Sequence, residues 1–309
     1  MSRVVVLTGA SSGIGRAAAL AFARRGDRVV LAARGLPSLH EVAAATGGLA
    51  VPADISDAAS VDALAAAAIA AHRRIDVWVD SAAVMAYGRF EDLPREVFDK
   101  VVTTDLLGSA NVARTALRVF RAQGSGTLVL CSSLLAHVTV PYMSAYVTAK
   151  WGLRGLIRTL QLETRDAPGI HVCAVAPGSV DTPIYRSAGN YAGREGSPPP
   201  PVASADRVAE VILRQADKPR PETSVGLANR VIELGFVAMP AVYNALVTTM
   251  MRTFGLSRRK VEAHEGNVFG PARPQPRRAR RGWTHSRRGS SVSRTTSSSG
   301  SHAVRPRVR

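Results

Sequence analysis

Short apolar runs recur along the first 226 residues of the chain, and longer segments with a helical spacing of apolar positions separate most of them. Two such segments, 56–72 and 204–216, predict helices. The apolar runs predict buried strands at residues 3–7, 28–32, 49–51, 75–79, 127–131, 170–175 and 223–225. Strands that alternate with helices are typical of a parallel sheet covered on both faces. We therefore predict an α/β fold with a Rossmann-type doubly wound parallel sheet, in a single domain over residues 1–226.

A different pattern marks an extension over residues 227–270. Its stretch 231–251 is unusually apolar, with Glu233 as the only charge and Pro240 near the middle. A straight helix of this length could span a bilayer, but the internal proline predicts a broken amphipathic helix pair. We expect the extension to cover an oligomer interface or a substrate pocket first. A membrane surface ranks second, and a membrane span ranks last.

The remaining residues, 271–309, form a basic tail. The tail holds 11 of the 40 basic residues and none of the 23 acidic ones, so it carries most of the net charge of +17. It is rich in Arg, Ser, Pro and Gly, which predicts disorder. Its arginine clusters can attract nucleic acid or anionic lipid by charge alone. We favour a solvated tail without a nucleic-acid partner, because Trp283 is its only aromatic residue.

The cysteines and the start of the chain bear on the cellular compartment. Cys131 and Cys173 each end an apolar run, where a free thiol behaves as a small hydrophobic group. This usage predicts neither a disulfide framework nor a metal site. The short apolar run at 1–7 leads straight into a glycine-rich turn, without the long apolar region of a signal peptide. We expect a cytoplasmic protein.

The first predicted strand ends in a glycine-rich turn that opens an Ala-rich helix. Glycines at such a turn let the backbone approach the pyrophosphate of a dinucleotide, and the helix N-terminus offers N–H groups to it. The spacing is Gly-x-x-x-Gly-x-Gly rather than the commoner Gly-x-Gly-x-x-Gly. The cofactor-binding residues that we predict in this turn are Thr8, Gly9, Ser11, Ser12, Gly13, Ile14 and Gly15.

The second and third predicted strands end in residues suited to the adenosine half of a dinucleotide. About twenty residues beyond the glycines, an acidic side chain would bind the ribose of NAD, whereas an arginine can pair with the 2′-phosphate of NADP. This chain has Arg34 there and no Asp or Glu, so we favour NADP, with a solvated surface arginine as the alternative. Asp54 and Ile55 follow the third strand, and the Asp54 carboxylate can accept from the adenine amino group.

Two later strand ends complete the predicted cofactor site. The small residues of 80–83 would let the backbone lie beside the cofactor, and 177–182 forms a turn after the strand at 170–175. Ligands of open parallel sheets bind at the carboxyl ends of the strands, where all these segments fall. The contacts that we predict here come from Ser81, Ala82, Pro177, Gly178, Val180 and Thr182.

The residues suited to proton transfer lie between Ser132 and Lys150. Tyr146 and Lys150 are four apart, so they share one face of a helix, and Ser133 follows a predicted strand. A nearby ammonium lowers the pKa of a phenol toward the working range of an acid or base. Ser133 can hydrogen-bond the same substrate oxygen. Alone, a Tyr and a Lys at this spacing are an ordinary surface pair, but the cofactor motifs upstream strengthen the catalytic interpretation.

Together these motifs resemble the classical short-chain dehydrogenase/reductase family over about residues 3–226. The resemblance implies a catalytic Ser, Tyr and Lys, matched by Ser133, Tyr146 and Lys150. It also implies a cofactor turn at Thr8, Gly9, Gly13 and Gly15, an NADP-selecting Arg34 and an adenine-binding Asp54. The nicotinamide would be held by Pro177, Gly178 and Thr182. Members of the family are often dimers or tetramers, so a homo-oligomer is expected.

Two departures from the family pattern concern charge. The chain has Asp80-Ser81-Ala82-Ala83 where the family usually has Asn-Asn-Ala-Gly, and Asp105 where the family often has a fourth catalytic Asn. In the family, the main chain of that Asn holds a water on the proton path from the Lys. A carboxylate at Asp105 would stabilise Lys150 as ammonium and oppose phenolate formation at Tyr146. We therefore keep Asp105 among the catalytic candidates and expect it to affect the rate and pH optimum.

The expected reaction interconverts a carbonyl and an alcohol with NADP(H), on a small-molecule alcohol, ketone or aldehyde. The loop 134–144 holds apolar residues that suggest a hydrophobic substrate or else belong to the core, namely Leu134, Leu135, Val138 and Met143. The Gly- and Pro-rich segment after Thr182 is predicted to lack regular structure and to form a lid, or else a passive linker. Two competing hypotheses are a non-catalytic NADP-binding protein and a protein that contacts membranes or anions through its C-terminal region.

Overall fold

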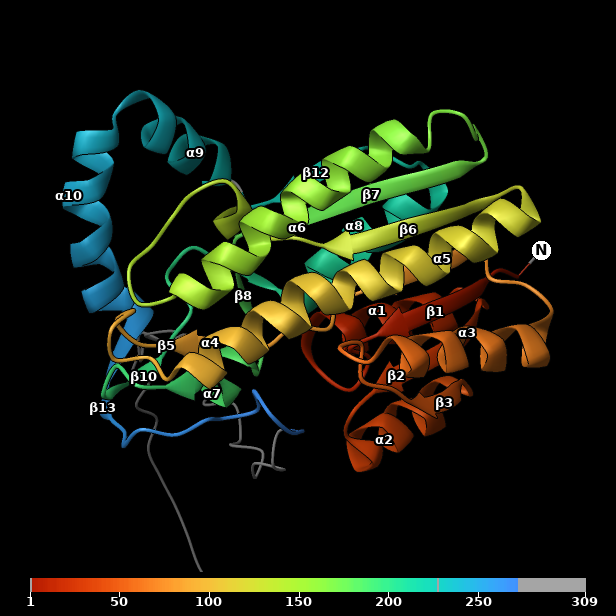
Figure 1. Cartoon of the computed structure of the whole chain (residues 1–309), viewed down its shortest axis with the longest axis horizontal. Helices are drawn as coiled ribbons and strands as arrows, with labels where there is room; N and C mark the ends of the chain where they lie inside the picture. Colours follow the sequence, from red (N-terminus) through yellow and green to blue (C-terminus); the bar gives the residue numbers. More distant parts are fainter. Residues whose placement is uncertain (1, 227, 272–309) are drawn as a thin grey trace, which may run out of the picture. The chain divides into compact units, whose positions relative to one another are not determined.

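The structure, a computed structural model, describes residues 2–226 and 228–271 (Figure 1). From residue 272 onward, the tail predicted to be disordered lies outside the described residues.

Seven parallel strands form one sheet in the order β12-β7-β6-β4-β1-β2-β3. The order reverses between β1 and β4, which makes the sheet doubly wound and confirms the predicted fold class. All seven predicted strands are present, with ends that differ by a few residues. Their bounds are β1 (Val4–Thr8), β2 (Arg28–Ala33), β3 (Leu49–Pro52), β4 (Val77–Asp80), β6 (Gly126–Cys131), β7 (Ile170–Pro177) and β12 (Glu222–Val225).

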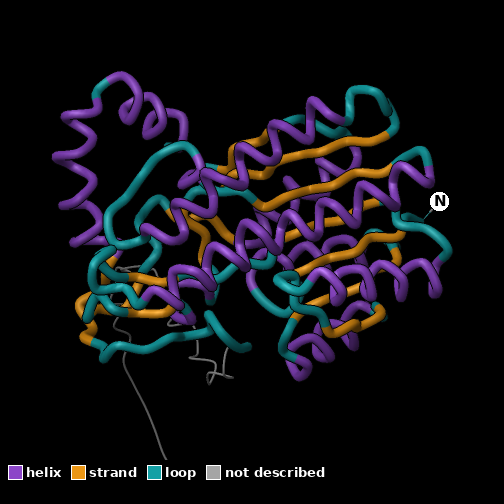
Figure 2. Tube along the Cα trace, in the orientation of Figure 1, coloured by secondary structure: helices purple, strands orange, loops and turns teal. Residues whose placement is uncertain are grey.

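Helices cover both faces of the sheet, as the alternation of helix and strand in Figure 2 shows. Successive side chains of β1 alternate between the two cores, so that Val5 and Leu7 face one and Val6 the other. One face carries α1 (Gly13–Arg24), α2 (Leu36–Thr46) and α8 (Ala205–Asp217). The other carries α3 (Ala58–His72), α5 (Ser109–Gln123) and α6 (Ser144–Glu163).

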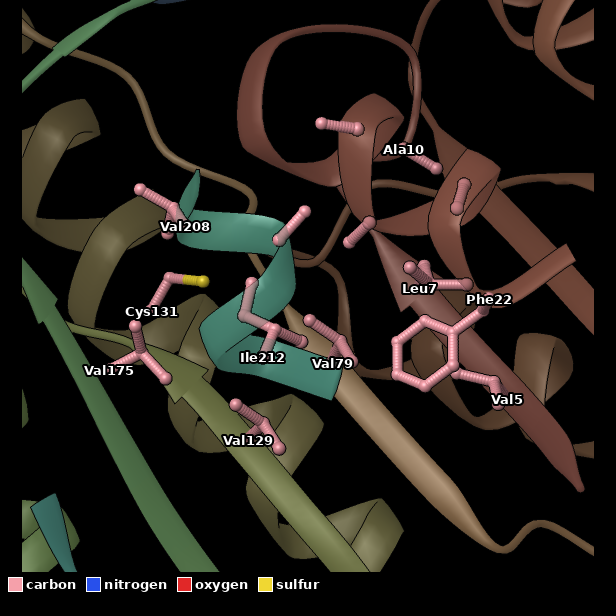
Figure 3. Packing of buried hydrophobic residues seen from close by; sticks show 14 of the residues in the cluster. Val5, Leu7, Ala10, Phe22, Val79, Val129, Cys131, Val175, Val208 and Ile212 are labelled. Atoms are coloured by element: carbon pink, nitrogen blue, oxygen red, sulfur yellow. The ribbon is translucent and has the colours of Figure 1, made fainter. Parts of the chain in front are cut away.

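The core between α1, α8 and the sheet fixes the glycine turn. Phe22 of α1 is fully buried against Val5 and Leu7, and Ile212 of α8 packs beside Val79 and Val129 (Figure 3). Burial of each such side chain contributes about 1.5–3 kcal/mol. Because α1 is held at this depth, its N-terminus stays at the carboxyl edge of β1.

Two features of the helices differ from the predictions or were not foreseen. Helix α2 was not predicted from the sequence. Helix α3 begins at Ala58, two residues after the predicted start at 56, because the carboxylate of its N-cap Asp57 accepts from the Ala59 amide at 3.0 Å. The segment before β6 forms α4 (Arg95–Val102), a π-helical turn η1 (Thr103–Gly108) and α5.

The segment after Thr182 has regular structure, so the prediction of an irregular insertion was wrong. It contains α7 (Ile184–Ser187) and three short strands, β9 (Gly189–Asn190), β10 (Arg194–Gly196) and β11 (Val202–Ser204). The strands that pair with them are β5 (Ala86–Tyr87), β13 (Leu256–Lys260) and β8 (Ser179–Asp181), respectively. Two of these partners lie more than fifty residues away in the chain, which is why the local pattern did not reveal them.

The extension forms two helices, α9 (Asn229–Ala238) and α10 (Pro240–Met250), followed by a π-helical turn η3 (Met251–Gly255) and β13. The predicted break at Pro240 is confirmed. A proline is tolerated as the first residue of α10 because its missing N–H would have no partner within the helix. The extension and the sheet belong to one compact unit. Within the described residues, none of the helices combines the length and the hydrophobicity that a bilayer crossing requires.

Candidate active site

A cavity of about 610 Å³ opens at the carboxyl ends of the parallel strands, and its wall continues onto α9 and α10. It brings together nearly all the predicted site residues. Gly15 and Asp105 are the two that do not line it. The predicted residues that line it are Thr8, Gly9, Ser11, Ser12, Gly13, Ile14, Arg34, Asp54, Ile55, Ser81, Ala82, Ser133, Tyr146, Lys150, Pro177, Gly178, Val180 and Thr182.

The glycine turn packs tightly against the loop after β4. Gly9 has φ +74°, and a Cβ there would lie 2.6 Å from the Ala82 amide nitrogen. A Cβ at Gly15 would lie 2.5 Å from the Ser81 hydroxyl, which itself donates to the Thr8 carbonyl at 2.8 Å. No side chain caps the N-terminus of α1 at Ser12, so its first N–H groups face the cavity wall without a side-chain acceptor. The turn therefore fits a dinucleotide phosphate.

Asp80, the first of the two residues whose charge departs from the family pattern, is buried and connects several elements. Its carboxylate accepts from the hydroxyls of Thr8 and Ser109, each at 2.7 Å, and from the Ala82 amide at 3.3 Å. Burial raises the pKa of Asp80, while these hydrogen bonds and the charge of Lys150 act in the opposite direction. Asp80 thus joins β1, β4 and the start of α5 at the base of the cavity.

The predicted Ser, Tyr and Lys converge on the cavity wall. The Lys150 ammonium donates to the Cys131 carbonyl at 3.1 Å and lies 5.4 Å from the centre of the Tyr146 ring. Ser133 lies near the Tyr146 phenol and acts to lower its pKa. The Ser133 hydroxyl also accepts from the Leu135 amide at 3.0 Å, which orients it at the start of its loop. All three side chains are buried, so their interactions are weakly screened.

Charges in this pocket oppose one another. Burial raises the pKa of Tyr146, and the positive charge of Lys150 only partly offsets this effect. The expectation that Lys150 lowers the phenol's pKa therefore describes one contribution, which burial outweighs. Burial alone would lower the pKa of Lys150, but the negative charges of Tyr146, Asp105 and Asp80 together raise it. Lys150 is consequently held as ammonium.

Asp105 lies behind these residues, in the π-helical turn η1. It is fully buried, and its Oδ1 accepts from the Val84 amide at 2.8 Å. Within the described part of the chain, its Oδ2 has no hydrogen-bond partner. Burial raises the pKa of Asp105 to about 7, against the lowering effect of Lys150. A π-turn often marks a functional position in a helix. Here it holds a titratable carboxyl group near enough to Tyr146 and Lys150 to raise the pKa of both.

The end of the cavity that was predicted to bind adenosine holds Arg34 in an arrangement that the sequence did not suggest. Its guanidinium donates to the backbone carbonyls of Asn267, Val268 and Gly270 at 2.7–3.1 Å. Residues 267–271 therefore lie beside the strand end that was predicted to bind a 2′-phosphate. Burial lowers the pKa of Arg34, against the effect of nearby carboxylates, but an arginine remains charged.

Asp54 is close to this end of the cavity. Its Oδ1 accepts from the Ser56 amide at 2.9 Å and from the Ser56 hydroxyl at 2.8 Å, and its Oδ2 lies 4.0 Å from the Lys100 ammonium. Burial alone would raise the pKa of Asp54, but these interactions lower it. The carboxylate is therefore ionised at neutral pH and suited to accept further hydrogen bonds.

Asn229 and Tyr185 are two of the cavity residues that were not predicted as site residues. Asn229 is buried at the start of α9, donates to the Ser224 hydroxyl at 2.9 Å, and lies so close to Gly178 that a Cβ there would be 2.6 Å from its Oδ1. Tyr185 lines the cavity beside Tyr146, and burial raises its pKa to about 12. Neither has a local motif, because each acquires its place through contacts distant in the chain.

Comparisons with known proteins agree with this geometry. The model for short chain dehydrogenase matches residues 3–191. Probable oxidoreductase EphD of Mycobacterium tuberculosis is 35% identical over 237 residues, which make up 71% of this chain but only 40% of that protein. Uncharacterized oxidoreductase YxnA of Bacillus subtilis is 30% identical over 264 residues, covering 81% of this chain and 72% of that protein.

A solved structure shows the same fold. An alcohol dehydrogenase from the archaeon Thermococcus sibiricus, in complex with 5-hydroxy-NADP, has a TM-score of 0.63 at 29% identity, covering 73% of this chain and 96% of that chain. The doubly wound sheet and the cavity at its switch point define a nucleotide-binding α/β oxidoreductase. Within that class, the chain belongs to the classical short-chain dehydrogenase/reductase family.

The tight packing of the glycine turn gives a first prediction. Gly15→Ala is expected to displace the turn from Ser81 and to weaken cofactor binding by about tenfold or more, because a displacement of this size disrupts the phosphate cradle. Titration of cofactor fluorescence measures the effect. Gly155→Ala on the α6 surface, where a Cβ meets nothing within 4 Å, is the matched control. Unchanged affinity in Gly15→Ala would contradict the packing argument.

A second prediction concerns Asp105. In Asp105→Asn, the negative charge near Tyr146 is lost, so the pKa of the phenol falls and a reaction step that uses the phenolate is expected to extend to lower pH. The pH profile of kcat/KM measures this shift.

Stability should change with pH as well. The pKa of Asp105 is about 7 in the folded protein and lower in the unfolded chain. The folded protein therefore loses stability as the pH rises from the unfolded pKa to about 7. The gain in Tm for Asp105→Asn should therefore be larger at pH 8 than at pH 5. An equal change in Tm at both pH values would mean that Asp105 is not the titrating group.

Proposed function

We propose that the protein is an NADP(H)-dependent oxidoreductase that interconverts a carbonyl and an alcohol on an apolar small molecule. One observation carries the proposal. Ser133, Tyr146 and Lys150 are buried together on the wall of one cavity, between a phosphate-binding turn and an apolar region. The whole arrangement fits an oxygen-bearing carbon placed beside a nicotinamide.

In the proposed reaction, the nicotinamide cofactor supplies or accepts the hydride at the substrate carbon. Ser133 donates a hydrogen bond that orients the substrate oxygen. During reduction, the Tyr146 phenol gives its proton to that oxygen, and during oxidation the phenolate takes it back. Lys150, held as ammonium, stabilises the phenolate form of Tyr146 across the short separation between the two side chains.

The choice of NADP(H) rests on the end of β2. Arg34 is the residue at this edge, the neighbouring Asp54 is taken up by Ser56, and the archaeal relative is complexed with a derivative of NADP. The contacts of Arg34 with the carbonyls of 267–270 add a condition. A 2′-phosphate would share or displace these contacts, since phosphate and carbonyl oxygens accept from the same guanidinium.

The proposed substrate class follows from the charges in the cavity. Among the described residues that line it, the charged side chains are Arg34, Asp54 and Lys150, which lie at the adenosine end or in the catalytic group. Beyond Tyr146 the wall is largely apolar, formed in part by Leu135, Val138 and Met143, as the sequence suggested. A carboxylate or a polyhydroxylated sugar would lose its water there without enough partners. We also propose a cytoplasmic homo-oligomer, as the family resemblance suggests.

A non-catalytic, cofactor-binding role is the second candidate, and Asp105 is the observation that favours it. An ionised Asp105 raises the pKa of Tyr146 further and would keep it a phenol. This would slow alcohol oxidation more than carbonyl reduction, because reduction uses the protonated phenol.

The third prediction separates these candidates. Tyr146→Phe should lower kcat for reduction of an apolar ketone by about 10²- to 10⁴-fold, because the proton donor is lost, with cofactor affinity largely retained. Assays of NADPH oxidation measure the rate. The control is Tyr191→Phe, since Tyr191 is not among the residues that line the cavity, and this variant should keep the wild-type rate. A Tyr146→Phe protein as active as the wild type would eliminate the proposed mechanism.

The fourth prediction tests the cofactor. Arg34→Ala should weaken NADPH binding by about ten- to a hundredfold, the effect of losing hydrogen bonds to a charged group, and should change NADH binding little. Fluorescence titration with both cofactors measures the difference, with Arg28→Ala at the exposed start of β2 as the control. A purely structural role in holding residues 267–270 would change the two affinities equally. That result would refute NADP selection by Arg34.

A further inference from the structure

The outer surface of α9 and α10 is exposed and apolar. We call this surface the lid face, and it consists of Val231, Leu234, Val237, Met239, Val242 and Leu246. Each of these side chains is more than half exposed. Large apolar side chains that gather on one surface mark an interaction site, whereas single exposed ones are ordinary. The positions of the two helices can be followed in Figure 1.

The lid face could be dehydrated without burying any charge. From Leu234 to Met251 the chain contains no Asp, Glu, Lys, Arg or His. Its exposed polar side chains are those of Asn244 and Thr249. Removing a charge from water is costly, so a surface without one is suited to an apolar environment.

The lid face is continuous with the inside of the cavity. Four of its residues also line the cavity, and they are Val231, Met239, Val242 and Leu246. The rim of the cavity on this side is therefore apolar both outside and inside. The cavity-lining residues that α9 and α10 contribute carry no charge.

The inner side of the two helices rests on the loop before α6 and on α6 itself. Phe236 packs near Trp151 and in a T-shaped pair with Tyr243, at ring distances of 6.3 and 5.1 Å. The Tyr243 hydroxyl donates to the Thr139 carbonyl at 2.7 Å, and Arg252 donates to the Tyr142 hydroxyl at 2.9 Å. These contacts hold the helices over the cavity and leave the lid face uncovered within the described chain.

Basic residues flank the lid face along the chain. Arg230 is the second residue of α9, Arg252 follows α10, and three exposed basic residues in β13 come next, Arg258, Arg259 and Lys260. Two of these arginines pair with carboxylates, Arg230 with Glu233 and Arg259 with Glu195. An apolar surface with a basic border is complementary to an anionic lipid bilayer, which offers acyl chains below a layer of negative headgroups.

We propose that the lid face docks on the surface of an anionic bilayer, and that the cavity takes an apolar alcohol or ketone from it. Helices α9 and α10 would lie in the interface, since neither is long enough to cross. A second copy of the chain is a weaker candidate occupant, because it would cover the apolar rim through which the substrate passes. The docking does not depend on the proposed reaction, whereas the delivery of substrate rests on it.

The test is co-sedimentation of the full chain with vesicles, which requires no turnover. Vesicles of phosphatidylcholine alone and with phosphatidylglycerol are compared at low and high salt, because the arginine-rich residues 271–309 could bind anionic vesicles by charge alone. The variant is Leu234→Glu with Val237→Glu, two residues of the lid face that do not line the cavity. The matched control is Leu162→Glu on α6, since Leu162 and Leu234 are both 65% exposed. Cofactor fluorescence verifies that each variant is folded.

Wild type and Leu162→Glu are expected to bind anionic vesicles, with binding to the lid face persisting at high salt. The affinity of the double variant for these vesicles should fall by about tenfold or more, because two apolar side chains are lost from the contact. Equal binding by the double variant, or binding that salt abolishes, would assign the interaction to the tail and overturn the proposal. Absence of binding by the wild type would overturn it too. If the wild type does not bind vesicles and the molecular mass of the protein in solution halves in the double variant, the lid face would be assigned to a second copy.

Discussion

The buried ammonium of Lys150 is the interaction on which the rest of the site depends. It donates to the Cys131 carbonyl at the end of β6, and the neighbouring acidic groups of Tyr146, Asp105 and Asp80 raise its pKa. A buried lysine without such neighbours would lose its proton. The sheet supplies what this charge needs, because parallel strands bring the ends of β4 and β6 to one edge. The fold thus holds groups of opposite charge close together in a buried site.

The two aspartates give this site its own electrostatic balance. The Asp80 carboxylate has a structural role, because it accepts hydrogen bonds from three donors in separate parts of the chain. Asp105 has one oxygen satisfied by the Val84 amide and the other without a partner in the described chain. Burial raises the pKa of both carboxyl groups; the hydrogen bonds of Asp80 oppose this effect, whereas the pKa of Asp105 reaches about 7. Acid–base behaviour at Tyr146 is consequently linked to a group that does not line the cavity.

The C-terminal extension is part of the cavity rather than an addition to it. Its helices form one wall, its strand β13 pairs with β10, and its carbonyls contact Arg34. Arg194 strengthens this attachment by donating to the carbonyls of Leu256 and Ser257. The Arg34 end and the Tyr146 end of the cavity are therefore both shaped by residues beyond 226, in a chain whose match to the family model ends at residue 191.

Local patterns in the sequence were enough to determine the seven strands, the glycine turn and the Tyr146–Lys150 spacing, because strand burial and helix periodicity depend on neighbouring residues. They were enough to place the break at Pro240 for the same reason. Tertiary structure alone decided the pairing of β9, β10 and β11, the carbonyl contacts of Arg34, the burial of Asp105 and the position of α9 and α10 over the cavity. Each of these rests on backbone or side-chain partners far along the chain, and such partners leave no periodic trace in the residues that they contact.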